Sequence, residues 1–136
     1  MAIETALRIR LPNRPGELAR VARQLANAGV NIRSVVCLTL GGEGVVEFLV
    51  DDLVAATRSL GPEGTAVREV RVVVTPIPTE VINQPGALAT LAEALAAAGI
   101  NIESLYAAIG PNGEVQSVLG CSDPEKAEPL MATWGR

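Results

Sequence analysis

Apolar and polar residues follow patterns along the first half of the chain that predict strands and helices. Residues 5–11 alternate apolar and polar side chains, which is typical of a half-buried β-strand. Pro15-Gly16 is expected to open a helix, with Pro15 in its first turn. Apolar side chains then recur at the spacing of one helix face: Leu18, Val21, Ala22 and Leu25. Gly29 stands where a left-handed C-terminal cap belongs.

The elements that follow complete a compact unit. Residues 32–40 and 45–50 predict two strands joined by a Gly-rich turn. Asp51 or Asp52 is placed to cap a second helix that ends near residues 60–61. Residues 66–74 predict one long strand, which we expect to bend at Pro76 and Pro78 into a further strand. The order strand, helix, strand, strand, helix, strand forms an antiparallel sheet with two helices on one face, the ferredoxin-like arrangement.

The second half of the chain predicts the same order. A helix is expected over residues 86–98, with these apolar side chains facing inward: Leu88, Leu91, Ala92 and Leu95. Strands are expected over 102–109 and 114–120, joined by an Asn-Gly turn, and Pro124 opens a last helix over roughly 124–133. The printed sequence leaves no room for a last strand, so the second sheet is expected to have an edge that needs covering.

An internal repeat with an offset of 70 residues relates the two halves. The segment Asn13-Arg14-Pro15-Gly16 returns as 83–86 with glutamine in place of arginine, and Gly29-Val30-Asn31-Ile32 returns as 99–102 with isoleucine in place of valine. Residues 13–34 align with 83–104 without a gap and share 13 of 22 residues. A period of this length suits two copies of a small domain. We therefore predict an α+β protein of two ferredoxin-like domains, residues 1–70 and 71–136.

Two runs of apolar residues suggest that more of each sheet is covered than one face. Residues 35–38 and 72–74 are apolar on both sides of their strands, whereas an antiparallel sheet open to water alternates. We expect these runs to be buried in an interface within the chain or between chains. Cys37 is expected in the core, because free cysteine behaves as a small apolar residue. Together with the missing last strand, these runs indicate a homodimer.

Composition and charge exclude several classes of function. The chain has no histidine and only two cysteines, which form no CxxC pair, so we expect no metal, no cofactor and no enzyme activity. A net charge of −4 argues against nucleic acid, and no apolar run reaches the length of a membrane span. The N-terminus lacks the character of a signal peptide, so a cytoplasmic protein is expected. Four carboxylates near one turn are explained by helix capping and solvation: Glu43, Glu47, Asp51 and Asp52.

The repeated motif resembles that of a known family. Asn-x-Pro-Gly-x-Leu followed by Ala-Gly-Val/Ile-Asn-Ile, with the two asparagines 18 residues apart, occurs twice and resembles the ACT domain family over nearly the whole chain. The resemblance implies a non-catalytic sensor of a small molecule, mostly an amino acid, that regulates an attached or associated enzyme of amino-acid metabolism. It also implies that the ligand sits at an interface between two such domains.

The resemblance implies binding residues in the loop before the first helix of each copy and at the start of its second strand. They are Asn13, Arg14, Gly16, Asn31 and Ile32 in one copy, and Asn83, Gln84, Gly86, Asn101 and Ile102 in the other. In the resembled arrangement, Asn13 of one domain faces Asn101 of its neighbour, and Asn83 faces Asn31. The backbone N–H groups of a helix start suit a carboxylate, and glycine lets a ligand approach the backbone.

Two features keep alternatives open. Leu11 and Val81 stand where some family members carry a polar residue, which favours a hydrophobic amino acid as ligand. Each asparagine, taken singly, is also explained as a turn or strand-start residue. The prediction is therefore an amino-acid-binding regulatory protein with an enzyme partner, and the alternative is a structural or assembly module that keeps the fold without binding a ligand.

Overall fold

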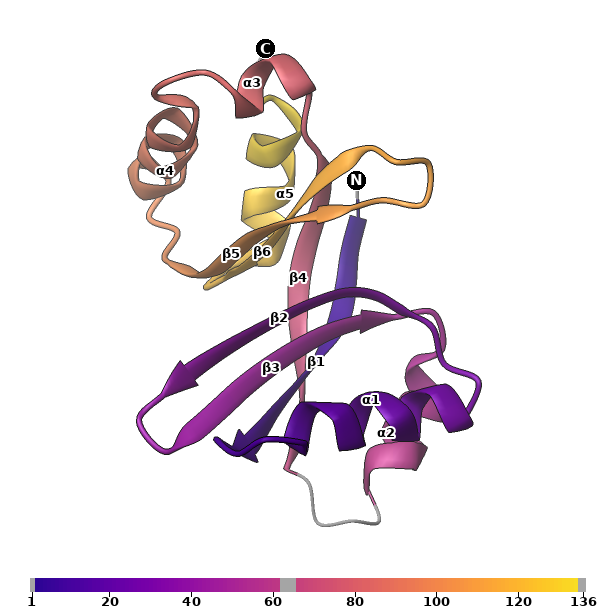
Figure 1. Ribbon diagram of the computed structural model, residues 1–136. Coiled ribbons are helices and arrows are strands. Elements are labelled where there is room, and N and C mark those ends of the chain that lie inside the picture. Colours follow the sequence, from indigo (N-terminus) through magenta and orange to yellow (C-terminus); the bar gives the residue numbers. More distant parts are fainter. Residues whose placement is uncertain (1, 62–65, 135–136) are drawn as a thin grey trace. The chain divides into compact units, whose positions relative to one another are not determined.

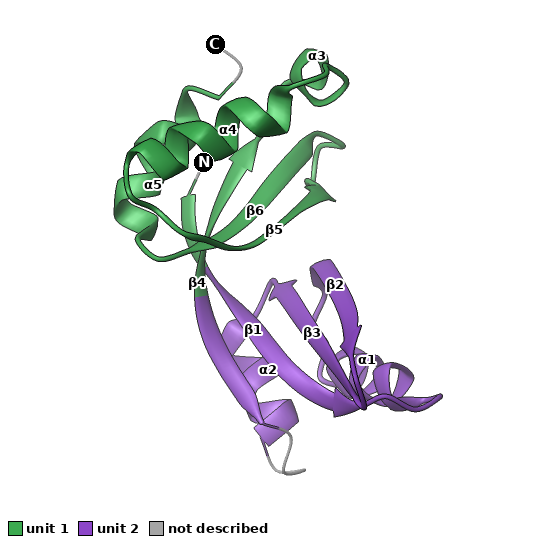
Figure 2. Cartoon of the chain, turned by 90° about the vertical axis from the view of Figure 1, so that its left-hand side faces the viewer, with its two compact units in different colours: residues 1–4, 71–136 green, residues 5–70 purple. Residues whose placement is uncertain are grey.

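A computed structural model describes residues 2–61 and 66–134 of the chain. The chain divides into two compact units, residues 5–70 and residues 1–4 with 71–136, coloured purple and green in Figure 2. We call them the N-terminal unit and the C-terminal unit. No helix in the described part of the chain is long and apolar enough to cross a membrane.

The N-terminal unit has the strand and helix order that the sequence predicts. Its elements are β1 (Ala2–Pro12), α1 (Glu17–Asn27), β2 (Ile32–Leu40), β3 (Glu43–Val50), α2 (Leu53–Leu60) and the start of β4 (Val67–Pro76). The strands lie in the order β2-β3-β1-β4, and β3 is antiparallel to both of its neighbours. Both helices lie on the same side of this sheet (Figure 1). Side chains such as Leu7, Val21, Leu25 and Phe48 form the core between them.

The C-terminal unit repeats this arrangement. The rest of β4 is followed by α3 (Thr79–Ile82), α4 (Ala87–Ala97), β5 (Ile102–Ile109), β6 (Val115–Cys121) and α5 (Pro124–Ala132). Here the strand order is β1-β4-β6-β5, with β6 antiparallel to β4 and β5. The core packs Val73, Leu91, Leu95, Leu119 and Met131. The predicted fold class of two ferredoxin-like βαββαβ units is confirmed.

The last strand that the second repeat lacks is replaced by the beginning of the chain. Residues 2–4 of β1 belong to the C-terminal unit, where β1 is the neighbour of β4. The half-buried side chain of Ile3 packs against the core of this unit. The edge of β4 that the sequence leaves open is therefore paired within the same chain.

Backbone details repeat between the units as well. The pairing of β2 with β3 shifts register between Ile32 and Ser34, and the pairing of β5 with β6 shifts between Ile102 and Ser104. Asp52 caps α2 by accepting a hydrogen bond from the Ala55 N–H at 3.0 Å, as predicted. The same offset thus preserves an irregularity of the sheet, which is stronger evidence for duplication than strand order alone.

Two helix predictions need correction. The left-handed Gly16 is the N-cap of α1, so Pro15 lies outside the first helical turn. Leu18 and Leu88 were expected to face inward, but they are 40% and 60% exposed. The fully buried positions of these helices are therefore Val21 and Leu25 in α1, and Leu91 and Leu95 in α4.

Two further predictions are wrong, the strand after the prolines and the burial of Cys37. Pro78 precedes the short helix α3, and its carbonyl accepts a hydrogen bond from the Val81 N–H at 2.9 Å. Cys37 is exposed, and Val35 and Leu38 are 49% and 64% exposed in the single chain, so the burial of this run between chains stays a prediction. They lie on β2, an edge strand of its sheet, where fewer neighbours cover a side chain. The run at 72–74, in contrast, is buried as expected.

Candidate functional site

The loop before α1 presents backbone donors at a helix start. Asn13 donates its backbone N–H to the Gly42 carbonyl at 3.0 Å, which fixes the beginning of the loop. Gly16 then caps the helix with a φ of 89°, a left-handed conformation that L side chains rarely adopt. No side chain caps this end, and within the described residues the N–H groups of Gly16, Leu18 and Ala19 have no acceptor. The helix start is therefore open to an anion.

The loop before α4 has the same geometry. Gly86 is left-handed, with a φ of 87°, and no side chain caps the helix. The Thr90 N–H donates to the Gly86 carbonyl at 2.9 Å, the same distance as the corresponding bond from Arg20 to Gly16. Leu88 and Ala89 again have N–H groups without an acceptor in the described part of the chain. The repeated sequence motif therefore specifies one backbone conformation twice.

The second asparagine of each motif is held through its backbone. Asn31 donates its N–H to Oδ1 of Asp51 at 2.9 Å, and its carbonyl accepts from the Asp51 N–H at 3.1 Å. Asn101 makes the same two bonds with Ser122, at 2.9 and 3.1 Å. Both asparagine side chains are exposed and have no hydrogen bond among the described residues. Sequence reasoning did not identify either backbone partner.

Within one unit the two asparagines lie far apart. Asn13 precedes α1 and Asn31 follows it, and a helix of 11 residues is roughly 16 Å long. The same separation holds for Asn83 and Asn101 at the two ends of α4. A site that uses both kinds of asparagine therefore requires two domains. Since the structure defines each unit separately, the expected pairing across a domain interface stays a prediction.

The isoleucines that follow these asparagines have a different role. Ile32 and Ile102 are half-buried and pack against the cores of their own units. Leu11 is also a core residue, only 4% exposed, so its side chain does not line a ligand site. The side chains available to a ligand therefore belong to the loops and to the first turns of α1 and α4.

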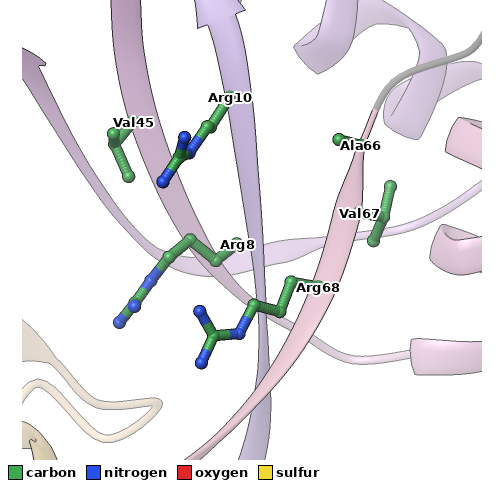
Figure 3. A pocket seen from close by; sticks show the side chains of 6 residues that line it. All are labelled: Arg8, Arg10, Val45, Ala66, Val67 and Arg68. Atoms are coloured by element: carbon green, nitrogen blue, oxygen red, sulfur yellow. The ribbon is translucent and has the colours of Figure 1, made fainter.

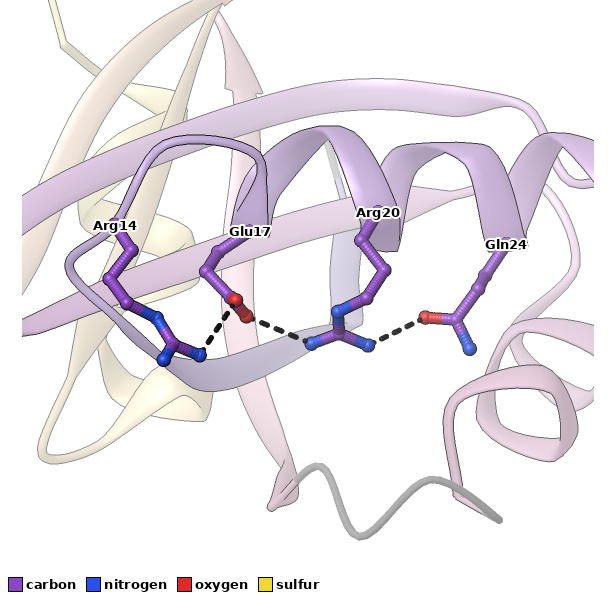
Figure 4. A network of polar contacts seen from close by, with 4 residues as sticks. All are labelled: Arg14, Glu17, Arg20 and Gln24. Atoms are coloured by element: carbon purple, nitrogen blue, oxygen red, sulfur yellow. Dashed lines mark hydrogen bonds and ion pairs between the residues drawn. The ribbon is translucent and has the colours of Figure 1, made fainter.

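In the N-terminal unit these side chains form a charged network. Glu17 accepts from Arg14 at 3.0 Å and from Arg20 at 3.2 Å, and Arg20 donates to Gln24 at 3.2 Å. Figure 4 shows the four side chains in one row along α1. The pKa of the Glu17 carboxyl is lowered, chiefly by the hydrogen bond from Arg20 and also by that from Arg14. The charged side chains around the loop of this unit thus pair with one another.

In the C-terminal unit the equivalent side chains are neutral and enclose a hollow. The positions of the network are taken by Gln84, Ala87, Thr90 and Ala94. A pocket of about 440 Å³ lies here, lined by Glu80, Val81, Gln84, Pro85, Gly86, Ala87, Thr90 and Trp134. The indole Nε1 of Trp134 donates to the Ala87 carbonyl at 3.1 Å, which holds the ring beside the helix start. The pocket therefore combines an acidic, a polar and an aromatic surface.

Two lining residues of this pocket were not predicted from the sequence. Glu80 lies on α3, where a strand was expected, and Trp134 follows α5. Trp134 is the only tryptophan of the chain, which was a signal available in the composition. Its place beside Ala87, 47 residues earlier, is a tertiary contact that no local pattern reports.

The acidic residues near the β2–β3 turn and after β3 have structural partners. Asp51 and Asp52 bond the backbone of Asn31 and Ala55, as given above, while Glu47 accepts from Arg8 at 2.8 Å. In the described part of the chain, no group of three or more His, Cys, Asp or Glu side chains is arranged to hold a metal ion. Burial raises the pKa of the Cys121 thiol, which disfavours the reactive thiolate.

Comparison with known proteins gives a family match to part of the chain and a shared fold. The model of the ACT domain matches residues 5–60. A crystal structure of a protein from Bacteroides thetaiotaomicron is 28% identical with a TM-score of 0.78, and the match covers 94% of this chain and 85% of that one. The ligand-free regulatory subunit of aspartate kinase from Thermus thermophilus is 18% identical with a TM-score of 0.69, covering 99% and 96%. No curated protein matches the chain.

A larger enzyme contains a portion whose fold is similar to that of this chain. The structure of E. coli aspartokinase III in complex with lysine and aspartate is 17% identical, with a TM-score of 0.53. The match covers 95% of this chain and 29% of that one. At this identity the likeness concerns the fold. The model of the ACT domain thus matches a large part of the N-terminal unit, and the C-terminal unit repeats the sequence motif, the left-handed glycine cap and the order of strands and helices of the matched segment.

Proposed function

We propose that this protein binds an amino acid without catalysing a reaction, and that it acts as an allosteric sensor or regulatory subunit for an enzyme of amino-acid metabolism. The observation that carries the proposal is the pocket at the start of α4. There the repeated motif, the unbonded N–H groups of the helix start and Trp134 meet in one place.

The chemistry of this pocket suits a zwitterion with an apolar side chain. The α-carboxylate is matched by the N–H groups at the helix start and by the positive end of the helix dipole. The ammonium is matched by the carboxylate of Glu80, and the side chain by the Trp134 ring and Val81. A hydrophobic amino acid satisfies all three surfaces at once.

The regulatory role rests on likeness in fold. A regulatory subunit of aspartate kinase has this fold over almost its full length, and the aspartokinase III structure holds lysine and aspartate. Regulation then follows from differential affinity: a ligand that binds one conformation more tightly shifts the population toward it, and an associated enzyme responds.

We also propose that the chain forms a homodimer through the edge of its N-terminal sheet. β2 ends that sheet, and its side chains Val35, Leu38 and Leu40 are 49%, 64% and 71% exposed. Apolar residues on an unpaired strand edge favour association with another chain. Sedimentation equilibrium is expected to give twice the chain mass, and Leu38→Lys is expected to give a monomer.

The alternative is a structural or assembly module without a ligand. One observation favours it: the backbone bonds of Asn31 and Asn101 explain these residues without any ligand. This alternative predicts that Asn13, Asn31, Asn83 and Asn101 tolerate alanine, with losses of stability no larger than those of a helix cap, about 1 kcal/mol.

The experiment that decides between an amino-acid sensor and a structural module is thermal unfolding in the presence of each of the twenty amino acids at millimolar concentration. A ligand at about one hundred times its Kd stabilises the folded state by roughly 2.7 kcal/mol, which raises the Tm of a chain of this size by several degrees. We expect such a shift with one chemical class, and none with the D-enantiomer. Asn13→Ala combined with Asn83→Ala is expected to remove it. No shift with any amino acid contradicts the proposal.

A further inference from the structure

A second pocket, in the N-terminal unit, is rich in arginine. It has a volume of about 490 Å³ and is lined by Arg8, Arg10, Val45, Ala66, Val67 and Arg68. Figure 3 shows the three arginine side chains extending to the same side, with Arg68 directed from β4 toward Arg8 on β1. The pocket is separate from the loops before α1 and α4.

Strand geometry explains why the arginines gather there. Leu7, Ile9 and Leu11 of β1 face the helices and form the core, so the alternating residues Arg8 and Arg10 face the other side of the sheet. β4 is the neighbour of β1, and its Val67 packs against the same core, which turns the adjacent Arg68 to the side of Arg8. Three cations therefore share one face of two paired strands.

Acidic residues neutralise this cluster only in part. Glu47, which pairs with Arg8 across the strands, accepts from it at 2.8 Å. Glu43 lies 3.8 Å from Arg10, and both side chains are largely exposed, so this ion pair is weak. Arg68 has no ion pair or hydrogen bond among the described residues. Like charges on neighbouring strands repel one another, so the cluster keeps an excess of positive charge that a bound anion would neutralise.

We propose that this pocket binds a small metabolite through a phosphate group. Guanidinium groups donate paired, parallel hydrogen bonds to phosphate oxygens, and a phosphate monoester carries nearly two negative charges at neutral pH. Arg68, and Arg10 with its weak ion pair to Glu43, supply donors, and Arg8, oriented by Glu47, supplies a third. The apolar side chains of Val45 and Ala66, which also line the pocket, receive the uncharged part of the metabolite. The site gives the protein a second ligand, of a chemical class different from the amino acid.

The test is isothermal titration calorimetry of the full chain with inorganic phosphate and with glycerol 3-phosphate, at constant ionic strength set by chloride. Succinate, a dicarboxylate, is the third titrant. We expect saturable binding of both phosphates with a Kd in the millimolar range or tighter, and weaker binding of succinate. Arg68→Gln is expected to weaken phosphate binding about tenfold or more, as loss of a charge-assisted hydrogen bond predicts.

Two further variants keep the result interpretable. Arg68→Lys retains the charge but loses the planar fork, so an intermediate affinity is expected. Arg58→Gln removes one exposed arginine on α2, outside the pocket, and is expected to bind phosphate like the parent protein. The proposal is overturned if phosphate binds without saturation, if succinate binds as tightly as phosphate, or if Arg58→Gln and Arg68→Gln weaken binding equally. Amino-acid binding at the pocket beside α4 is unaffected by either outcome.

Discussion

The loops before α1 and before α4 share one backbone and differ in almost every side chain that surrounds it. Both have a left-handed glycine cap, with φ of 89° and 87°, and both leave the same N–H groups unbonded in the described structure. Around the first loop Arg14, Glu17 and Arg20 satisfy one another. Around the second, neutral residues leave a hollow that Trp134 closes on one side.

This difference separates the part of the motif that has a structural role from the part that we propose selects a ligand. Proline and glycine of the motif fix the loop conformation, and they are the same in both copies. The residues between and after them differ, so they are free to specialise. We therefore propose the loop of the C-terminal unit as the amino-acid site, and interpret the loop of the N-terminal unit as one whose charged side chains pair with one another.

The largest effects are expected from equivalent residues of the two cores. Leu25 and Leu95 occupy the same position in α1 and α4, and both are fully buried. Each change to alanine is expected to lower the free energy of unfolding by about 2–5 kcal/mol. Because β1 and β4 each run from one unit into the other, we expect the chain to unfold as a single cooperative system.

Urea unfolding, followed both by circular dichroism and by Trp134 fluorescence, tests whether the two units unfold together. Trp134 reports on the C-terminal unit, whereas the dichroism reports on both units. For Leu25→Ala, the two signals are expected to shift to the same lower midpoint. A Trp134 transition that stays at the midpoint of the parent protein means that the units unfold independently.

Smaller effects are expected at the glycine caps. Apart from the adjacent residues, no atom in the described part of the chain lies within 4 Å of the place where a side chain would begin at Gly16 or Gly86. The cost of alanine is therefore that of the left-handed backbone, about 1–2 kcal/mol. The two variants should be equally destabilised, and asparagine should cost less than alanine at both positions. Only Gly86→Ala is expected to reduce the thermal shift given by the amino acid. An equal reduction by Gly16→Ala would remove the distinction between the two loops.

Exchanging one residue between the loops should move binding with little change in stability. Thr90→Arg places in the pocket the side chain that the N-terminal unit has at the equivalent position, and the exposed site tolerates arginine, a good helix former. We expect loss of the amino-acid response, with a change in unfolding free energy within about 0.5 kcal/mol. The reverse change, Arg20→Thr, is the control and should bind normally. A normal response in Thr90→Arg excludes this pocket as the site.

The smallest expected effect concerns acid stability. The lowered pKa of Glu17 means that its ion pairs stabilise the fold above the pKa of the unfolded chain, about 4.3, and that this contribution is lost as the pH falls through the folded value. Glu17→Gln should be slightly less stable than the parent protein at pH 7 and equal to it at pH 2.5. Glu125→Gln should behave alike, because Arg71 lowers the pKa of Glu125. A stability difference that persists at pH 2.5 would mean that the charge is not its cause.

Local patterns predicted most of the secondary structure. Residues 32–40 and 102–109 are strands with the predicted limits, and Asp52 caps α2 because helix capping depends on adjacent residues. The place of residues 2–4 beside β4 was not predicted, since it depends on pairing between segments distant in the sequence. Cys37 was misplaced for the same reason: its exposure follows from the edge position of β2, which composition does not reveal.

The sequence predicted the loops of the candidate site but not all of the side chains that line it. The sequence predicted the left-handed Gly29, which has a φ of 74°, and it located the loops that contain Gly16 and Gly86, but it did not predict that these two glycines are left-handed N-caps. The pocket was not predictable, since Glu80 and Trp134 reach it only through the short helix α3 and the end of α5. The residue pattern thus indicated two loops as candidate sites, and tertiary contacts determined that the loop before α4 lies beside a pocket.

The most direct test of this account is the fluorescence of Trp134 during titration with each of the twenty amino acids. Trp134 is the single tryptophan of the chain and lines the pocket, so a ligand there changes its surroundings. We predict a saturable change in emission with a hydrophobic amino acid, present in the parent protein and in Arg20→Thr and absent in Thr90→Arg. An unchanged emission with all twenty, or a change that survives in Thr90→Arg, would contradict the assignment of the amino-acid site to the C-terminal unit.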